Sequence, residues 1–460
     1  VGSGLDLSSI LDSLTAAQKA TLTPISNQQS SFTAKLSAYG TLKSALTTFQ
    51  TANTALSKAD LFSATSTTSS TTAFSATTAG NAIAGKYTIS VTHLAQAQTL
   101  TTRTTRDDTK TAIATSDSKL TIQQGGDKDP ITIDISAANS SLSGIRDAIN
   151  NAKAGVSASI INVGNGEYRL SVTSNDTGLD NAMTLSVSGD DALQSFMGYD
   201  ASASSNGMEV SVAAQNAQLT VNNVAIENSS NTISDALENI TLNLNDVTTG
   251  NQTLTITQDT SKAQTAIKDW VNAYNSLIDT FSSLTKYTAV DAGADSQSSS
   301  NGALLGDSTL RTIQTQLKSM LSNTVSSSSY KTLAQIGITT DPSDGKLELD
   351  ADKLTAALKK DASGVGALIV GDGKKTGITT TIGSNLTSWL STTGIIKAAT
   401  DGVSKTLNKL TKDYNAASDR IDAQVARYKE QFTQLDVLMT SLNSTSSYLT
   451  QQFENNSNSK

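Results

Sequence analysis

Residues 403–453 read VSKTLNKLTKDYNAASDRIDAQVARYKEQFTQLDVLMTSLNSTSSYLTQQF, and their apolar side chains recur in steps of three and four. This spacing is the seam of a heptad repeat, which keeps one apolar stripe on one side of a long helix. One extra four-residue step near Val425 is a stutter in that repeat. The stripe consists of Val403, Leu407, Leu410, Tyr414, Ala417, Ile421, Val425, Tyr428, Phe432, Leu435, Met439, Leu442, Leu449 and Phe453. The pattern predicts a long C-terminal helix that packs along a partner.

The first 56 residues carry a shorter version of the same pattern. Asp6 or Ser8 is placed to cap a first helix over 7–20, and Pro24 suits the start of a second helix that runs to Leu56. The apolar positions are Leu22, Ile25, Phe32, Leu36, Tyr39, Leu42, Leu46, Phe49 and Leu56. We therefore expect helices at both ends of the chain.

The middle of the chain changes to a period of two, which indicates half-buried strands. We expect strands at 85–91, 119–123, 131–135, 156–163, 167–173, 183–187, 208–213, 218–226, 240–244 and 253–257. Two short helices are predicted at 141–150 and 232–239, and the similarity of their sequences suggests duplicated β-rich modules. The Ser/Thr-rich segment 62–84 reads as a linker with one or two extended edge strands.

Helical periodicity returns at Ser261, and we expect helices over 261–284, 306–321 and 351–360 and near 365–370, with a small hairpin over 333–350. The chain is therefore predicted to be a multi-domain α + β protein, in which a terminal coiled-coil stem and a helical leg domain bracket nested β-rich head domains. The expected boundaries are 1–42 with 405–460 for the stem, 43–75 with 261–404 for the leg, 76–112 with 212–260 for the first head domain, and 113–211 for the second.

Composition narrows the class of function. Apolar residues make up 37% of the chain and charged residues 16%, both below the usual shares, and the net charge is −8. No basic cluster is present, so neither nucleic acid nor an anionic membrane is expected as a partner. No apolar run approaches the ~18 residues that span a bilayer. The start has no pattern of a cleaved secretory signal, which leaves the cytoplasm or export without cleavage.

No constellation for catalysis or ligand binding emerges from the residues. The chain has no cysteine and one histidine, His93, in a polar context without an acidic partner. Asp341–Lys346 lacks the ligands of a calcium loop, and Gly371–Gly377 lacks the spacing of a phosphate loop. The adjacent pairs Asp107-Asp108 and Asp190-Asp191 read as solvated turns. We expect no catalytic residue, no cofactor and no metal, and hence no enzyme.

The outer faces of the terminal helices are unusually poor in charge. From Val437 to Phe453 there is no ionisable group apart from the tyrosine, and Ser, Thr and Asn are mediocre helix formers. Such helices depend on tertiary packing for their stability. We hypothesise that both termini are mobile in the free monomer and become ordered in an assembly. The alternative is a plain intramolecular coiled-coil stalk.

Five stretches resemble the flagellar filament cap family, also called hook-associated protein 2. Gly2–Asp6 with Ser37–Leu46 is similar to that family's opening, and Met439–Phe453 is similar to its close. Ile336–Leu354 resembles its helical leg domain. Leu142–Leu170 resembles an insertion motif that is shared with flagellins and hook proteins. The resemblance extends over both ends and two stations between them.

The resemblance implies a ring of identical subunits at the distal tip of the bacterial flagellum, outside the cell, with a pentamer favoured over a hexamer. It implies flagellin and the hook-associated junction proteins as partners, an export chaperone on the C-terminal helix, and export by the flagellar type III route without a cleaved signal. Flagellin would fold and insert beneath the cap. The contact seam to the filament is then assigned to Leu36, Tyr39, Leu42, Leu46, Tyr428, Phe432, Leu435, Met439, Leu442, Leu449 and Phe453.

Other functions stay open on the residues alone. One is another flagellar axial protein, such as a hook–filament junction protein or a flagellin. A second is an adhesin whose β-rich head binds mucin or glycan, although no aromatic-lined sugar site stands out in the sequence. A third is a cell-surface enzyme, which the scarcity of candidate catalytic groups disfavours.

Overall fold

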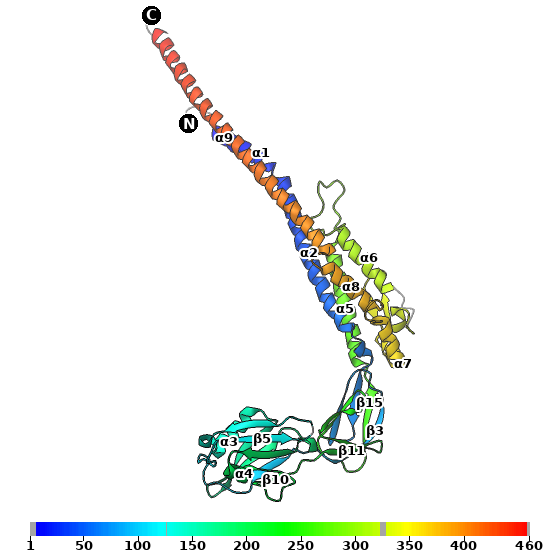
Figure 1. The fold of residues 1–460 in the computed structure, drawn as a ribbon. Coiled ribbons are helices and arrows are strands. Elements are labelled where there is room, and N and C mark those ends of the chain that lie inside the picture. The colour runs from blue at the N-terminus through cyan, green and yellow to red at the C-terminus, as the bar shows by residue number, and fades with distance from the viewer. Residues whose placement is uncertain (1–5, 126, 323–327, 458–460) are drawn as a thin grey trace. The chain divides into compact units, whose positions relative to one another are not determined.

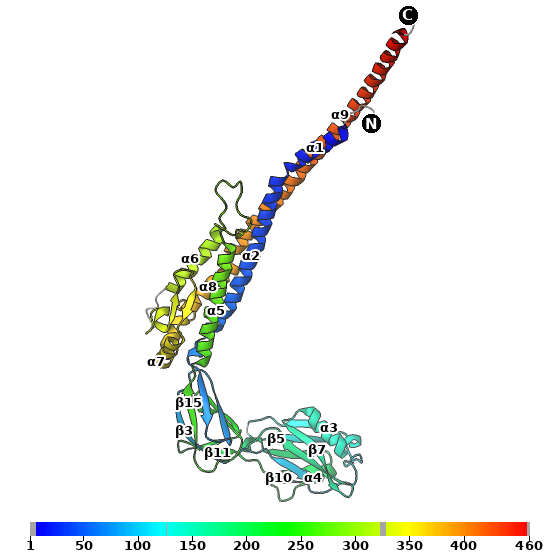
Figure 2. The ribbon, with the colours of Figure 1, turned by 180° about the vertical axis from the view of Figure 1, so that it is seen from behind.

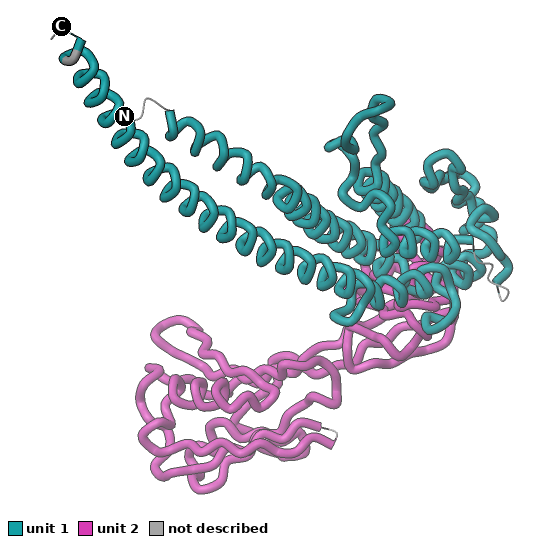
Figure 3. The backbone as a smooth tube through the Cα atoms, turned by 90° about the horizontal axis from the view of Figure 1, so that it is seen from above, with its two compact units in different colours: residues 1–59, 263–460 teal, residues 60–262 magenta. Residues whose placement is uncertain are grey.

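The computed structural model describes residues 6–125, 127–322 and 328–457 and divides into two compact units (Figure 3). Unit 1 joins the two ends of the chain, residues 1–59 and 263–460. Unit 2 is the segment between them, Asp60–Lys262. The β-rich middle is thus inserted into a helical unit, and the predicted fold class is confirmed.

The regular structure in the described part of unit 1 is helical apart from one small hairpin (Figure 1). Its helices are α1 (Leu7–Ala20), α2 (Thr23–Leu56), α5 (Ser261–Leu284), α6 (Ser308–Ser322), η4 (Leu333–Ile336), α7 (Ala351–Ile369), α8 (Ile378–Leu390) and α9 (Ile395–Ser457), and its hairpin pairs β16 (Ile338–Thr340) with β17 (Leu347–Leu349). Helix α7 kinks at Asp361, where the backbone leaves helical geometry. The first two helices and the 333–350 hairpin lie where the sequence predicted them.

The core of unit 1 forms where α2, α5 and α8 meet. Phe49, Trp270 and Tyr274 are almost fully buried, and their ring centroids lie 5.9 to 6.2 Å apart. Asn53, also buried, accepts a hydrogen bond from the Trp270 indole nitrogen at 3.0 Å and donates one to the carbonyl of Thr379 at 2.8 Å. This amide satisfies buried polar groups on two other helices, so it fixes how the three helices meet.

A second polar contact joins α2 to the start of α6. The carboxylate of Asp307 accepts hydrogen bonds from the Tyr39 hydroxyl at 2.6 Å and from the Leu310 backbone N–H at 3.0 Å, and it pairs with Lys35 at 3.0 Å. Burial alone would raise the pKa of Asp307, but these donors outweigh it and hold that pKa below its usual range. Burial, followed by the bond to this carboxylate, raises the pKa of Tyr39.

Unit 2 contains fifteen of the strands in the described part of the chain. They are β1 (Thr65–Ser69), β2 (Phe74–Thr78), β3 (Gly85–His93), β4 (Thr99–Thr102), β5 (Ser118–Gln124), β6 (Ile131–Ile135), β7 (Val156–Gly164), β8 (Glu167–Ser174), β9 (Met183–Ser188), β10 (Met208–Val212), β11 (Ala217–Val221), β12 (Val224–Asn228), β13 (Thr232–Leu237), β14 (Ile240–Leu244) and β15 (Gln252–Gln258). Its helices are η1 (Ala59–Phe62, which begins at the unit boundary), η2 (Ala137–Asn139), α3 (Leu142–Ala152), η3 (Leu179–Asn181) and α4 (Asp191–Met197).

Two hydrophobic cores lie within unit 2. The first core gathers buried residues of 74–95 and 217–256, from the sheets ordered β1-β15-β3-β11-β12 and β13-β14-β2. The second core gathers buried residues of 100–208, from the sheets ordered β10-β4-β8-β7 and β6-β5-β9 together with α3 and α4. The strand ladders are antiparallel throughout, and the chain passes between the cores along β3–β4 and β10–β11. Figure 2 shows the strands and helices of unit 2 from behind.

The predicted helix at 232–239 is wrong, because these residues form β13. They pair with β14 around a tight turn at Asn239, and Ile233 is buried in the first core opposite Leu242. The predicted single strand 218–226 is likewise two strands, since Asn222 and Asn223 take positive φ and close a two-residue hairpin. Tertiary pairing therefore overrode a short helical pattern.

Three further expectations need correction. Segment 62–84 is folded, with β1 and β2 at sheet edges, so the edge strands are confirmed and the linker is not. Helix α8 was not predicted, because its threonines obscured four buried apolar positions spaced at helical intervals. Asp190 is no solvated turn residue: it is buried, and its carboxylate accepts bonds from the N–H groups of Leu193 and Thr115, which lower its pKa.

We predict that Asp307→Asn lowers the free energy of unfolding of unit 1 by about 1–3 kcal/mol at neutral pH, because the carboxylate accepts charge-assisted bonds. The pKa of Asp307 is lower in the folded than in the unfolded chain, so its contribution is complete above the unfolded value near 3.8. That contribution disappears as the pH falls through the folded pKa, and the difference between the two proteins should vanish there.

Tryptophan fluorescence during urea unfolding measures this change, since both tryptophans of the chain, Trp270 and Trp389, lie in unit 1. The exposed Asp291→Asn is the matched control and should unfold as the unaltered protein does. A difference between Asp307→Asn and the unaltered protein that stays constant down to pH 2 would contradict the assignment.

Candidate functional site

The stem is formed by the two ends of the chain packed side by side (Figures 1 and 2). Helices α1 and α2 lie along α9 in the opposite direction, and the Gln29 amide donates to the Thr411 hydroxyl across the pair at 3.2 Å. In an antiparallel pair the register advances residue by residue, so Asp6 falls opposite about residue 434 of α9. The helix α9 continues beyond that point to Ser457.

The predicted seam residues lie in two different environments. Tyr39, Leu42 and Leu46 are buried within unit 1, with 2% or less of their surface exposed, and Leu36 is half-buried. On α9, Tyr428, Phe432 and Met439 are half-buried, whereas Leu435, Leu442, Leu449 and Phe453 expose 38%, 54%, 49% and 72% of their surface. The seam is therefore covered near the leg and progressively uncovered towards the C-terminus.

We call residues 441–457 the overhang, because the described part of the N-terminal helices ends before it. Every residue of the overhang whose burial the structure describes is exposed. At 1.5 Å per residue this single helix is roughly 25 Å long and lies beyond the described part of its partner. Figure 3 shows the same end of α9 standing alone. An isolated helix of this length is marginal in water, so its order depends on a further contact.

The chemistry of the overhang favours burial. Its apolar positions Leu442, Leu449 and Phe453 continue the seam, and no lysine, arginine, aspartate or glutamate interrupts them. The hydroxyls of Ser444, Thr445 and Thr450 each donate to the carbonyl four residues earlier, at 2.9 Å. Because these hydroxyls are already satisfied within the helix, covering this surface strands few polar groups.

The sequence pattern missed a second apolar surface, which lies on the overhang and just before it. Val437 and Tyr448 are 66% and 61% exposed, and the 100° turn per residue places both on the side of α9 opposite the seam. Leu438, 56% exposed, lies beside the seam. The uncovered end of α9 could have been expected from helix lengths, since α9 is 63 residues long and the two N-terminal helices together are shorter.

Helix α1 is only shallowly anchored to the stem. None of its residues is buried, and Ile10 exposes half of its surface. Asp6 caps its start by accepting a bond from the Ser9 N–H at 3.2 Å. Local capping and a shallow contact with α9 thus hold this helix, and both are weak constraints.

The polar candidates elsewhere have local roles. Asp341 accepts bonds from Ser343 and closes the hairpin turn between β16 and β17. Asp372 accepts the N–H groups of Lys374, Lys375 and Thr376, which lower its pKa and shape the loop before α8. In another turn, Asp108 binds the backbone of Thr111 in the same manner.

The remaining candidate positions bring no cluster together. His93 is exposed at the end of β3. Over 6–125, 127–322 and 328–457, no three potential metal ligands converge. None of the helices built from described residues combines the length and the hydropathy that spanning a bilayer requires. The candidate functional surface is the uncovered end of the stem, and we expect it to act by contacting a partner.

Comparisons with known proteins give matches along the chain. The model of the flagellar hook-associated protein 2 N-terminus matches residues 3–98, that of the C-terminus matches residues 214–444, and the flagellin hook IN motif matches residues 119–176. The last of these contains most of the second core of unit 2. The insertion motif inferred from the sequence is thereby confirmed.

Curated relatives agree with the family models. Flagellar hook-associated protein 2 of Escherichia coli O157:H7 is 99% identical over 460 residues, with 100% of this chain and 98% of the relative covered. The Salmonella typhimurium protein of that name is 51% identical over 456 residues, with 98% and 97% covered. A crystal structure of the flagellar cap protein FliD D1-D2-D3 domains from Escherichia coli aligns with a TM-score of 0.76 at 96% identity, and covers 80% of this chain and 99% of that one. The chain belongs to the flagellar hook-associated protein 2 family.

Proposed function

We propose that the chain is the subunit of a ring-shaped cap at the distal tip of a bacterial flagellar filament, outside the cell. The cap promotes the folding and insertion of exported flagellin and prevents its loss to the medium, without covalent chemistry. Family membership along nearly the whole chain is the observation that carries this proposal. The uncovered apolar end of α9 supports it, since a subunit that works alone has no use for such a surface.

In this proposal the seam has two tasks. Leu36, Tyr39, Leu42 and Leu46 hold the stem to the leg within one subunit, where they are wholly or partly buried. The part of the seam on α9 makes the contact with the filament and with neighbouring subunits, and comprises Tyr428, Phe432, Leu435, Met439, Leu442, Leu449 and Phe453. A thin apolar stripe makes many small contacts, which suits a cap that steps as each flagellin is added.

The partners follow from the same role. The ring consists of copies of this chain, with a pentamer favoured and a hexamer as the alternative, and it meets flagellin and the hook-associated junction proteins. Before export by the flagellar type III route, which needs no cleaved signal, a cytoplasmic chaperone covers the C-terminal helix. The overhang supports this last step, because a bare apolar helix invites aggregation in the cytoplasm.

The adhesin alternative has less support. The hollow at the ends of β5, β6 and β9 is lined by Asp117, Ser118, Lys119, Asp134, Ile135, Ser136, Ser188 and Gly189. It contains no aromatic ring on which a sugar could stack, and Lys119 is paired with Asp134. Its polar side chains are ordinary for the solvent face of a sheet.

Deletion of the gene tests the proposed function directly. The deletion strain should release flagellin into the culture medium as unpolymerised monomer and carry short or no filaments, and the intact gene supplied in trans should reverse both. Immunoblots of the medium and electron microscopy of the cells measure the outcome. Normal filaments in the deletion strain would overturn the cap assignment and leave the adhesin alternative standing.

Charge placed on the uncovered seam should abolish capping without unfolding the subunit. Leu449→Asp buries a carboxylate in the assembled contact, which costs several kcal/mol, so flagellin loss should approach that of the deletion strain. Ser444→Asp is the matched control, since it adds the same charge to the opposite side of the overhang. Tryptophan fluorescence should report unchanged unit 1 stability in both variants. Equal capping by the two variants would show that the seam is not the contact.

Hydrogen exchange distinguishes an assembly-dependent stem from a permanent stalk. Backbone amides of 441–457 should exchange rapidly in dilute monomer and slow at least about tenfold in the assembled cap, since only assembly covers them. Amides of α5, whose apolar side is buried in unit 1, should stay protected in both states. Strong protection of the overhang in dilute monomer would exclude assembly-dependent ordering.

A further inference from the structure

The two cores of unit 2 are joined by little covalent structure. The chain crosses between them twice, near Gln96 and near Gln215, and the two crossings pair through reciprocal backbone hydrogen bonds of 2.8 and 3.2 Å. A ribbon of two paired strands twists and bends readily when nothing else restrains it. The two hydrophobic cores are separate clusters, so the apolar effect does not fix the angle between them.

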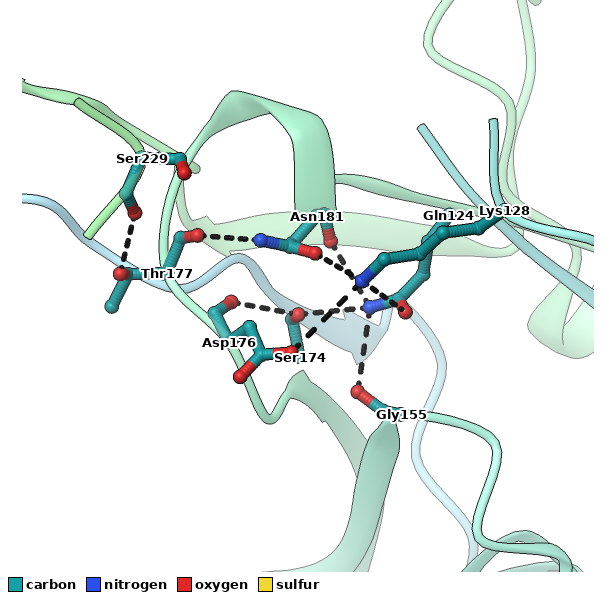
Figure 4. A network of polar contacts seen from close by, with 8 residues as sticks. All are labelled: Gln124, Lys128, Gly155, Ser174, Asp176, Thr177, Asn181 and Ser229. Atoms are coloured by element: carbon teal, nitrogen blue, oxygen red, sulfur yellow. Dashed lines mark hydrogen bonds and ion pairs between the residues drawn. The ribbon is translucent and has the colours of Figure 1, made fainter. Parts of the chain in front are cut away.

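A loop of the second core makes a third connection. Residues 174–181 follow β8 and reach the first core, where the Thr177 hydroxyl donates to the carbonyl of Ser229 at 2.7 Å (Figure 4). The Leu179 N–H donates to the Asn216 side chain at 2.8 Å, and the Gly178 N–H donates to the carbonyl of Gln96 at 3.0 Å. The loop thus contacts both crossings and the β12–β13 turn.

The same loop is held firmly from its own side. Gln124, 6% exposed, donates through its amide to Gly155, Ser174 and Asn181, and its neighbour Lys128 binds the Asn181 side chain (Figure 4). Asn181 in turn donates to the carbonyl of Thr177 at 2.7 Å. Ser174 and Asn181 are buried, so these bonds form where water competes poorly for them.

Gly178 sets how closely the loop meets the first core. Its backbone, at φ 96° and ψ 162°, lies in a region that is essentially confined to glycine. A Cβ atom built on it would lie 2.5 Å from Cβ and 2.6 Å from Cα of Ser229, well inside van der Waals contact. Any side chain at this position must therefore push the two cores apart.

We propose that residues 174–181 form a rigid joint, which fixes the angle between the two cores of unit 2 so that the inserted head acts as one stiff body. The loop adds a third attachment to the two chain crossings, and it consists of directed hydrogen bonds instead of an adaptable apolar contact. Gly178 is the positioning residue of this joint. The consequence for capping, a head that holds its place in the ring, rests on the proposed function.

The joint is tested by measuring the distance between the cores in solution. The chain has no cysteine, so the exposed pair Lys86→Cys on β3 and Asn151→Cys on α3 carries two spin labels without background. Pulsed electron spin resonance on the full-length protein should give one narrow distance distribution. Adding Gly178→Ala should shift that distribution and broaden it about two-fold, as expected when a local contact opens. Thr177→Val, which removes one hydrogen bond, should give a smaller change.

Gly164→Ala is the matched control, because Gly164 has φ 99° but nothing within 4 Å of a Cβ atom. A side chain there is strained by the positive φ but meets no clash, and the distance distribution of this variant should equal that of the unaltered protein. Circular dichroism confirms that each variant is folded. A folded Gly178→Ala variant with the unaltered narrow distribution would overturn the joint.

Flagellin retention by the same variants separates the joint from the proposed function. Loss of retention with Gly178→Ala, but not with Gly164→Ala, links the rigid joint to capping. Failure of the unaltered gene to retain flagellin would overturn the capping role and leave the distance result, and with it the joint, intact.

Discussion

The antiparallel packing of the chain's two ends is the contact on which the rest of the structure depends. Helices α1 and α2 meet α9 along one apolar seam, and α2 also meets α5 and α8 around Asn53 and Trp270. The chain leaves the helical unit after α2 and returns to it at α5. Formation of the helical unit therefore brings together residues that are hundreds of positions apart in the sequence. Both ends of the β-rich segment are therefore attached to this one helical unit.

The same chemistry recurs at each joint of the molecule. With 37% apolar residues, the chain builds several small cores and connects the elements between them by amides and hydroxyls. Asn53 links three helices, Asp307 links α2 to α6, and Gln124 supports the loop that joins the two cores of unit 2. Directed bonds of this kind specify orientation, which separate apolar clusters cannot do.

The overhang is an exception to this pattern of small buried cores joined by hydrogen bonds. There an apolar surface is left uncovered, the hydroxyls of Ser444 and Thr450 donate to carbonyls of the helix itself, and no charged side chain lies between Leu442 and Phe453. A surface with these properties is poorly suited to water and well suited to a partner that covers it. An isolated helix of this length is marginal in water, which fits the proposal that the subunit completes its fold in an assembly.

The prediction from sequence was most accurate where a long periodic pattern decided the structure. The helices at 7–20 and 24–56, the C-terminal helix and most strands lie where expected. It failed for 232–239 and α8, where short or threonine-rich segments take their structure from neighbours, and for Asp190, whose burial depends on a distant loop.

The sequence by itself therefore determined the heptad seam, the change of period that marks the inserted unit, and the family. Only the tertiary structure decided which half of the seam is covered, because coverage depends on where the N-terminal helices end along α9. It likewise decided the joint at Gly178, since the contact with Ser229 exists only after two separate sheets have folded. The periodicity of a helix or strand can be read from one segment of the sequence. Whether its apolar side is covered, or how closely it approaches another backbone, depends on a second segment that is distant in the sequence.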